Sequence, residues 1–388
     1  MDPACKKFVK AWLLATVGAL AVVAGLNVLV DPLGAYPGLH LKSFEPLRYM
    51  YEERTAKAEM ARRGDWAALI LGSSRAAAGI PATHPFVTTQ SCCNLSFPAA
   101  RFPELVRAFE YASERNPLKR VVLCLDLYMF NQGPPWVLDF HDSRFNPRLE
   151  LFPYRFKQLL GSASTDFTWT TLWRKVVRSQ PLPQQTRGFH YNRIKPGVSQ
   201  RELFNHLLPI IGAGYGPQTL DWSYVEQLRQ VVRVCRERKI DLQIAIMPVH
   251  ALDLEYLQAR GGWPQFEEWK KKLVAILAEE GVEGEVALWD FTAYAGPPAE
   301  AVPPAGDVTT RMKYYFENSH FTPVLGALML DAMFGSPGAN EFGVKINRAN
   351  IEAHLARLRD DRTAYVQINA ADVEWVQRLA GAGGANPK

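Results

Sequence analysis

The sequence predicts an α/β protein with a transmembrane helix at its N-terminus. Three observations predict this: a charge-free apolar segment near the N-terminus, five short apolar runs further along the chain, and amphipathic helical patterns between those runs. Apolar runs that alternate with helical patterns are typical of a parallel sheet covered by helices on both faces. We therefore expect a three-layer sandwich with a parallel five-stranded sheet and a helical insertion.

The composition is that of a globular protein with a sizeable core. Of the 388 residues, 48% are hydrophobic and 21% are charged, which excludes a disordered chain, a coiled coil and a collagen. The formal net charge of +5 is too small for this length to indicate a protein that binds nucleic acid. The five cysteines lack metal-site spacing, and no Walker-type loop or dinucleotide fingerprint is present, so we expect no metal and no cofactor.

The N-terminal apolar segment is long enough to cross a membrane. Residues 11–30 carry no charge, and a helix of that length spans the roughly 30 Å hydrocarbon layer. Lys6, Lys7 and Lys10 precede it, so the positive-inside tendency keeps residues 1–10 in the cytoplasm. A cleaved signal peptide is the alternative, but its apolar region usually covers only about 7–15 residues. We expect a single-pass protein of the bacterial inner membrane, anchored in the bilayer, with its C-terminal body in the periplasm.

The exported chain divides into a membrane-proximal segment (31–64), an α/β domain (65–336) and a helical tail (337–388). Residues 131–216 interrupt the α/β domain and are rich in proline and aromatic residues. One helical pattern of this insertion, at 165–179, has an apolar stripe, which we expect to pack into a helical core rather than to form a lid or a partner surface. The stripe consists of Trp169, Leu172, Trp173, Val176 and Val177.

The five expected strands are short and continuously apolar, as strands covered on both faces are. They lie at residues 67–71, 92–97, 120–125, 242–247 and 286–289. Helical patterns follow at 102–115, 223–239, 266–279 and 322–334, and in the tail at 350–359 and 371–379. Pro103 in a first turn and a capping-box pattern from Ser223 to Glu226 mark two of the helix starts.

Reactive residue types follow the first strand and precede the last helix of the α/β domain. Residues 71–75 read Leu-Gly-Ser-Ser-Arg, a small-residue turn in which a serine hydroxyl at a helix start meets backbone N–H groups that favour an oxyanion. Residues 317–320 read Glu-Asn-Ser-His, and such a carboxylate can orient the imidazole so that it takes the serine proton. A lone serine in such a turn is more often a helix cap. The prediction of a catalytic site therefore depends on finding the serine after the first strand together with the glutamate and histidine before the last helix.

This arrangement resembles the SGNH/GDSL hydrolase superfamily, whose serine follows the first strand and whose Asp-x-x-His precedes the last helix. The segments DPLG, LILGSSR, NLSFPAA, LDLYMFN, MPVHA, WPQFEEWKKKL, LWDFTAY and YYFENSHFTPVLG are similar to a membrane-anchored, uncharacterised bacterial branch of that superfamily. They extend from the anchor to just before Gly335. The resemblance implies an SGNH or flavodoxin-like sandwich.

The resemblance also implies roles for individual residues. Ser74 matches the nucleophile, His320 the base and Glu317 the position usually held by aspartate. Backbone amides of Ser74 and of Ala99, which stands where the superfamily has glycine, match two donors of the oxyanion hole. The asparagine of the third superfamily block is missing, and Asn131 can replace it only if its loop folds back.

Three more residues are candidates for substrate binding. His250 follows the fourth strand and Asp126 the third, at the edge where open parallel sheets bind ligands. Arg75, beside the serine, could hold an anionic group. The alternatives are a structural histidine, a loop cap and an ion pair with a nearby carboxylate.

The resemblance of His320-Phe321-Thr322-Pro323 to motifs of periplasmic acyl-transfer proteins implies a partner as well as an activity. Those proteins work with membrane-bound O-acyltransferases. We therefore expect a serine esterase or O-acyltransferase acting on a glycan or lipid of the envelope. The alternatives are a catalytically silent SGNH-like scaffold and a glycan-binding module that stacks sugars on Trp136, Trp169 and Trp173.

Overall fold

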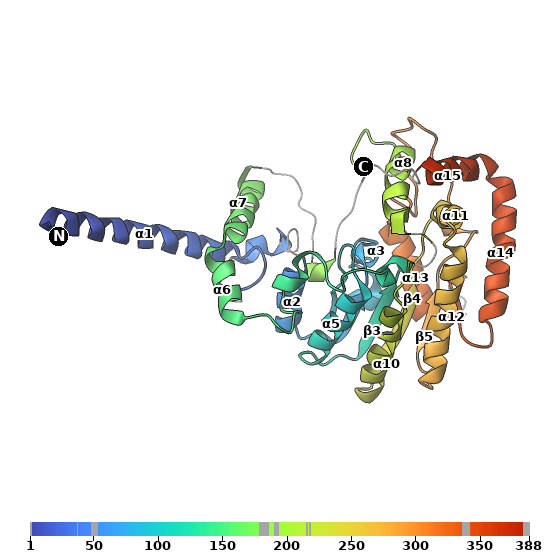
Figure 1. The fold of residues 1–388 in the computed structure, drawn as a ribbon, viewed down its shortest axis with the longest axis horizontal. Helices are drawn as coiled ribbons and strands as arrows, with labels where there is room; N and C mark the ends of the chain where they lie inside the picture. The colour runs from blue at the N-terminus through green and yellow to red at the C-terminus, as the bar shows by residue number, and fades with distance from the viewer. Residues whose placement is uncertain are drawn as a thin grey trace. The chain divides into compact units, whose positions relative to one another are not determined.

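A computed structural model describes residues 2–36, 38–47, 53–177, 186–189, 194–214, 216, 219–335 and 342–382. The chain forms two compact units, drawn in Figure 1: residues 1–64 with 138–186, and residues 65–137 with 187–388. The predicted insertion at 131–216 is therefore not one part. Residues 138–186 belong with the N-terminal helix, whereas the rest belongs with the sheet.

The N-terminal unit begins with α1 (Pro3–Val30), a helix of 28 residues. Within the described ranges it is the one helix that is long and apolar enough to cross a membrane. The Asp2 carboxylate caps its first turn by accepting from the Ala4 N–H at 3.0 Å. Because the helix starts at Pro3, most of the predicted cytoplasmic stretch 1–10 continues the apolar helix rather than preceding it.

The DPLG motif after α1 turns the chain back on the helix end. Asp31 is buried in the left-handed conformation, with φ 45°. Its carboxylate accepts from the N–H groups of Ala35 at 2.6 Å and Tyr36 at 3.2 Å. Ten residues after Asp31, the Leu41 N–H donates to the Leu29 carbonyl at 2.8 Å, so this segment is tied to the last turn of α1.

The rest of the unit is helical. Its elements are η1 (Lys42–Leu47), α2 (Glu53–Arg63), η3 (Leu138–Asp142), α6 (Leu151–Leu160) and α7 (Ser162–Val177). α6 and α7 pack on α1. The prediction that the apolar stripe of α7 is buried is wrong, because the Trp169 side chain is 66% exposed and Val176 is 78% exposed. Of that stripe, Leu172 packs inward, against Val30 and Phe44.

The second unit is built on a sheet of six strands in the order β2-β1-β3-β4-β5-β6. Five strands are parallel and lie at the predicted places: β1 (Ala68–Leu71), β2 (Cys92–Asn94), β3 (Arg120–Leu125), β4 (Asp241–Ile246) and β5 (Ala287–Asp290). The sixth strand, β6 (Val344–Ile346), pairs antiparallel with β5 and was not predicted, because three residues carry too little pattern.

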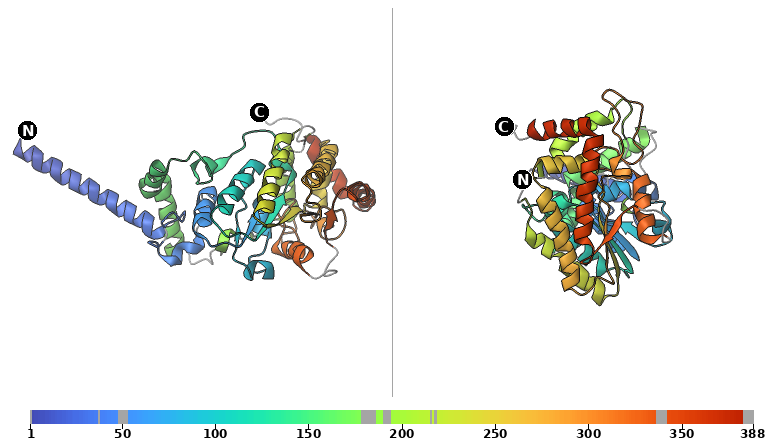
Figure 2. Two further views of the ribbon diagram at one scale, coloured as in Figure 1. Left: turned by 90° about the horizontal axis from the view of Figure 1, so that it is seen from below. Right: turned by 90° about the vertical axis from the view of Figure 1, so that its right-hand side faces the viewer.

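Helices lie on both sides of this sheet (Figure 2). In chain order they are α3 (Ser74–Gly79), α4 (Pro85–Thr88), α5 (Phe102–Ser113), η2 (Leu127–Phe130), η4 (Thr186–Gly188), α8 (Gln200–Ile211), η5 (Gly212–Gly214), α9 (Trp222–Glu226), α10 (Leu228–Glu237), α11 (Ala251–Ala259), α12 (Trp263–Glu279), η6 (Pro297–Ala299), α13 (Pro323–Phe334), α14 (Ile351–Ile368) and α15 (Ala370–Ala382). The predicted helix 223–239 is thus divided, and its cap is Asp221 rather than Ser223.

The predicted tail is part of the α/β unit, not a separate element. Besides β6 it supplies α14, which is fastened to the sheet by a buried hydrogen bond: His354 Nε2 lies 2.8 Å from Asp290 Oδ2. Lys270 Nζ lies 2.6 Å from the same oxygen. Burial alone would raise the pKa of Asp290, but the Lys270 ammonium and the hydrogen bond with His354 more than offset it and hold this pKa well below its usual range.

Close packing of α3 against α13 brings the serine turn next to the histidine loop. A Cβ added at Gly326 would lie 2.0 Å from the Gly79 carbonyl oxygen, and one added at Gly79 would lie 2.1 Å from the Phe321 ring. Such distances leave no space for a methyl group. The two glycines therefore set the separation between α3, which begins at Ser74, and the chain around His320.

Replacing Gly326 by alanine should lower the free energy of unfolding by about 1–3 kcal/mol, because the new methyl meets backbone that cannot move without shifting a helix. Urea unfolding of the detergent-solubilised chain measures the change. Gly284→Ala is the control, since nothing lies within 4 Å of a Cβ at that position. Equal stabilities for the two variants would contradict the packing argument.

Candidate active site

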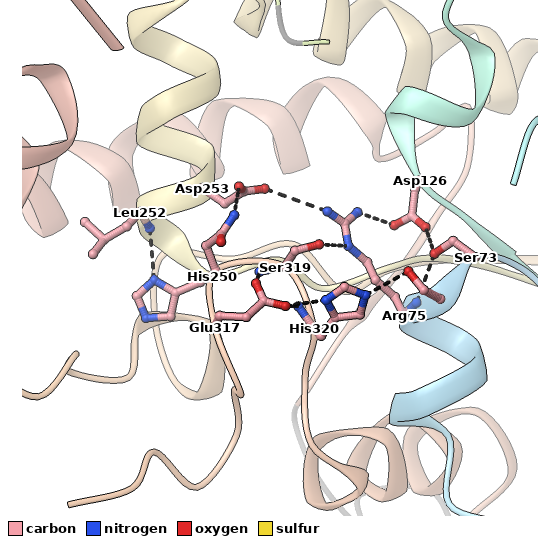
Figure 3. Close-up of polar contacts among 11 residues, drawn as sticks. Ser73, Arg75, Asp126, His250, Leu252, Asp253, Glu317, Ser319 and His320 are labelled. Atoms are coloured by element: carbon pink, nitrogen blue, oxygen red, sulfur yellow. Dashed lines mark hydrogen bonds and ion pairs between the residues drawn. The ribbon is translucent and has the colours of Figure 1, made fainter. Parts of the chain in front are cut away.

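A serine, a histidine and a glutamate form a continuous hydrogen-bonded relay. Ser74 Oγ lies 2.8 Å from His320 Nε2. On the other side of the ring, Nδ1 contacts Glu317 Oε1 (Figure 3). The geometry assigns the ring proton to Nδ1, where the carboxylate accepts it, and leaves Nε2 to accept from the Ser74 hydroxyl. The structure thus brings together residues that are 246 positions apart.

The turn after β1 places Ser74. A Cβ added at Gly72 would lie 2.8 Å from the Cβ atoms of both Ala76 and Cys124, so this position has space only for glycine. Ser73 caps α3 by accepting from the Arg75 N–H at 3.1 Å. Ser74 is then the first helical residue, whose N–H has no acceptor within the helix.

A tight loop places His320. The two ends of this loop are joined by an isolated β-bridge between Tyr315 and Phe321. The Phe316 N–H donates to the His320 carbonyl at 2.9 Å. The buried Glu317 carboxylate fills the loop, accepting from the N–H of Ser319 at 2.6 Å and from that of His320 at 2.9 Å. Glu317 therefore orients both the backbone and the ring of the histidine. The Glu317 side chain is one methylene longer than the aspartate expected at this position, and it is accommodated because its carboxylate bonds to the N–H groups of its own loop.

Ser74 and His320 open onto a pocket of about 350 Å³. Both are half-buried, so a substrate can reach their polar atoms. The pocket has polar and apolar walls. Its lining residues are Ser74, Ala99, Arg101, Tyr128, Asn131, Ile210, Ile211, Ser319 and His320.

The two residues expected to complete an oxyanion hole border this same pocket. Ala99 has φ 49°, a left-handed conformation that glycine adopts without strain. Asn131 lies there because η2 turns the chain after β3, with the Asn131 N–H bonded to the Tyr128 carbonyl at 3.1 Å. This turn brings Asn131 to the same pocket as Ser74.

Arg75 and Asp126 do not line the pocket with Ser74. Both are 2% exposed, and they form an ion pair with each other. Arg75 Nε donates to Ser319 Oγ at 2.9 Å, and Asp126 Oδ2 accepts from Ser73 Oγ at 2.6 Å (Figure 3). The prediction that they bind substrate does not fit these positions. The guanidinium instead joins the serine turn to the histidine loop.

His250 is also structural rather than substrate-binding. The side chain is buried as the cap of α11: Nδ1 accepts from the Leu252 N–H at 3.2 Å, and Nε2 donates to the Glu300 carbonyl at 2.6 Å. Burial lowers the pKa of His250 to about 4, so the ring is neutral at pH 7. Its backbone N–H donates to the Asn318 carbonyl at 3.2 Å and so supports the histidine loop from behind.

Sequence reasoning missed Arg101 and the end of α8. Arg101 Nη1 donates to the Asn131 carbonyl at 2.7 Å, which ties the loop of Ala99 to that of Asn131. Ile210 and Ile211 reach the pocket from α8, a helix that the sequence placed in a separate insertion. The one available signal was Arg101, a charged residue directly after the NLSFPAA motif and before a helix.

In the described part of the chain, no group of three or more His, Cys, Asp or Glu residues could hold a metal ion. The five cysteines are free thiols, and all but Cys5 are buried. Burial raises the pKa of Cys92 and of Cys235 to about 12, so neither is a thiolate at neutral pH.

No protein-family model matches this chain, and no curated protein matches its sequence.

Because His250 is neutral and buried when folded, the protein should lose stability in acid. The folded state binds fewer protons than the unfolded state between the folded pKa of about 4 and an unfolded pKa of about 6.5. Stability therefore falls as the pH decreases through this window, by about 3 kcal/mol for this one group. Urea unfolding at pH 7 and pH 4 measures the loss.

His250→Asn is the matched control, since asparagine can still cap α11 but does not titrate. The variant should lose about 3 kcal/mol less than the parent between the two pH values. If both proteins lose the same amount, His250 does not cause the acid sensitivity.

Proposed function

We propose that this protein is a membrane-anchored serine esterase or O-acyltransferase. The observation that carries the proposal is the relay in which Ser74 Oγ lies 2.8 Å from His320 Nε2 while Glu317 holds the opposite ring nitrogen. Serine is a weak nucleophile unless a base takes its proton, and a base is effective when a third group orients it. Ser74, His320 and Glu317 supply the nucleophile, the base and the group that orients the base.

In the proposed acylation step, Ser74 Oγ attacks the carbonyl carbon of an ester and its proton passes to His320 Nε2. The imidazolium is stabilised by the Glu317 carboxylate. When the tetrahedral intermediate collapses, the bond to the leaving alcohol breaks, and His320 returns the proton to the alcohol oxygen. The acyl group remains on Ser74.

In the second step the proton moves the other way. Water, or a sugar hydroxyl, loses a proton to His320 Nε2 as its oxygen attacks the acyl carbon, and Ser74 leaves with that proton. Hydrolysis and acyl transfer therefore differ only in the acceptor. The pocket is lined by the polar Tyr128 and Asn131 and by the apolar Ile210, a combination that suits either a glycan or a lipid.

The oxyanion would be stabilised by donors around Ser74. The Ser74 N–H at the start of α3 is one, and the Ala99 backbone and the Asn131 side chain border the same pocket. This is the set that the SGNH resemblance implies. We propose on that basis that the chain is a distant SGNH relative, with Glu317 in place of aspartate and Asn131 in place of the third-block asparagine.

The substrate class follows from the location that we propose. α1, with Lys6, Lys7 and Lys10 near its start, would span the inner membrane and leave the α/β unit in the periplasm. Esters of envelope polysaccharides and lipids are the acyl compounds available there. A membrane-bound O-acyltransferase is the partner that the motif around His320 suggests.

A fluorophosphonate should form a covalent adduct with Ser74, because it phosphonylates an activated serine with release of fluoride. Mass spectrometry of the labelled peptide locates the adduct. Ser74→Ala should abolish labelling, and His320→Ala should slow it by about 10²–10⁴-fold, the usual contribution of a general base.

Ser73→Ala is the matched control, since that neighbouring hydroxyl is buried and donates to Asp126. It should still give an adduct at position 74. An unlabelled yet folded chain would instead favour the catalytically silent scaffold.

Asn131→Ala should reduce the rate of labelling by about 10²–10³-fold if the side chain donates to the oxyanion. Tyr128→Phe, at another lining position, is the comparison and should change the rate far less. A normal rate for Asn131→Ala would remove this residue from the oxyanion hole and leave the backbone donors alone.

A further inference from the structure

Helix α7 buries polar side chains and exposes apolar ones, the opposite of a helix on the surface of a water-soluble protein. Its buried residues are Ser164, Thr168 and Thr171. Its outward face carries Trp169, Trp173 and Val176, which recur at helical spacing and are more than half exposed. The hydrophobic effect places side chains the other way round in water.

Helix α6 shows the same reversal. Its buried side chains are Tyr154 and Gln158. Its exposed side chains include Phe152, 82% exposed, and Phe156, 57% exposed. Two neighbouring helices thus present aromatic and aliphatic residues outward together. Isolated exposed apolar residues are common, but several large ones on two neighbouring helices indicate an interaction surface.

Hydrogen bonds fill the interior between these helices and α1. The Asn27 amide, 1% exposed, donates to the Leu159 carbonyl at 2.9 Å and to Thr165 Oγ1 at 3.1 Å. Ser164 Oγ donates to Gln158 Oε1 at 3.1 Å. Small hydroxyl residues and a buried amide between helices, with apolar residues outside, are typical of helices packed within lipid.

The dimensions place α6 and α7 at the membrane boundary rather than across the membrane. α6 has 10 residues and α7 has 16, which correspond to about 15 and 24 Å, short of the roughly 30 Å hydrocarbon layer. Both helices run transverse to α1 at its C-terminal end (Figures 1 and 2). A helix that is transverse to a membrane-spanning helix lies in the plane of the interface.

The positions of charged residues on α6 and α7 are consistent with helices that lie in the membrane interface. Asp166 and Lys175 are exposed on α7, and Lys157 of α6 pairs with Asp142 at 2.8 Å. Such charges are tolerated among lipid headgroups but not in the hydrocarbon. Tryptophans such as Trp169 and Trp173 are enriched at that same level.

We propose that α6 and α7 form a second membrane contact, which lies in the lipid interface and inserts its aromatic face into the leaflet at the C-terminal end of α1. We take the occupant of this face to be lipid, because α6 and α7 pack on α1, whose own exposed side chains are apolar, and because the interior between the three helices is polar. The inference rests on the proposed membrane-spanning role of α1 and is independent of catalysis. It predicts that α1 is held against tilting and that residues 31–44 stay at the membrane surface.

The experiment uses the full chain in nanodiscs of phosphatidylethanolamine and phosphatidylglycerol. In a Cys5→Ser background, Phe152→Cys and Val176→Cys each carry one environment-sensitive fluorophore, since the other native cysteines are buried. Doxyl-labelled lipid should quench both probes at least twofold, and aqueous iodide should quench them little. Asp360→Cys, on the exposed face of α14, is the aqueous control and should show the reverse.

Leu14→Cys separates this inference from the placement of α1. Lipid quenching at positions 14, 152 and 176 supports the proposal. Lipid quenching at 14 with iodide quenching at 152 and 176 overturns it and leaves the anchor in place. Shielding of 152 and 176 from both quenchers also overturns it, because a protein surface then covers this face. Iodide quenching at 14 overturns anchor and inference together, whereas fluorophosphonate labelling of Ser74 reports on catalysis alone.

Discussion

A buried cation, the guanidinium of Arg75, joins the elements that carry the candidate site. It forms an ion pair with Asp126 at the end of β3, donates to Ser319 in the histidine loop and lies 3.9 Å from the Asp253 carboxylate on α11. A charge removed from water to this extent is tolerated only when it is paired. The partners of Arg75 must therefore stay where they are, and the turn that begins α3 is held beside the loop that carries His320. The relay between Ser74 and His320 depends on that constraint.

The two units differ in where they place polar and apolar side chains. In the α/β unit, buried polar side chains such as Asp290 and His250 are enclosed by an apolar core and satisfied within it. In the N-terminal unit, Asn27 and the hydroxyls of α7 occupy the interior while the tryptophans face outward. Under the proposed insertion of this unit into lipid, the surroundings would explain the contrast: water favours polar surfaces, whereas lipid favours apolar surfaces and requires polar groups to bond to one another. One chain would thus use both arrangements.

Features that depend on local spacing were predictable. The charge-free stretch at 11–30 indicated α1, and the short apolar runs indicated the five parallel strands. Because parallel strands align their carboxyl ends, the serine after β1 was expected on the same edge as the loop before α13. Glu317 and His320 lie three residues apart in that loop, so their contact needed no long-range information. Ser74 with its partner His320 followed from these facts and from the resemblance of the motifs.

Tertiary structure alone decided what each side chain faces. Periodicity shows that α7 has an apolar stripe, but the same stripe can meet protein or lipid, so the exposure of Trp169 could not be predicted. Arg75, Asp126 and His250 have residue types that serve equally in binding and in structure, and only burial among specific partners distinguished the two. The approach of α8 to the pocket depends on a segment that is distant in the sequence from the serine turn and from the histidine loop. Local sequence does not encode such contacts, because they are set by packing between elements rather than within them.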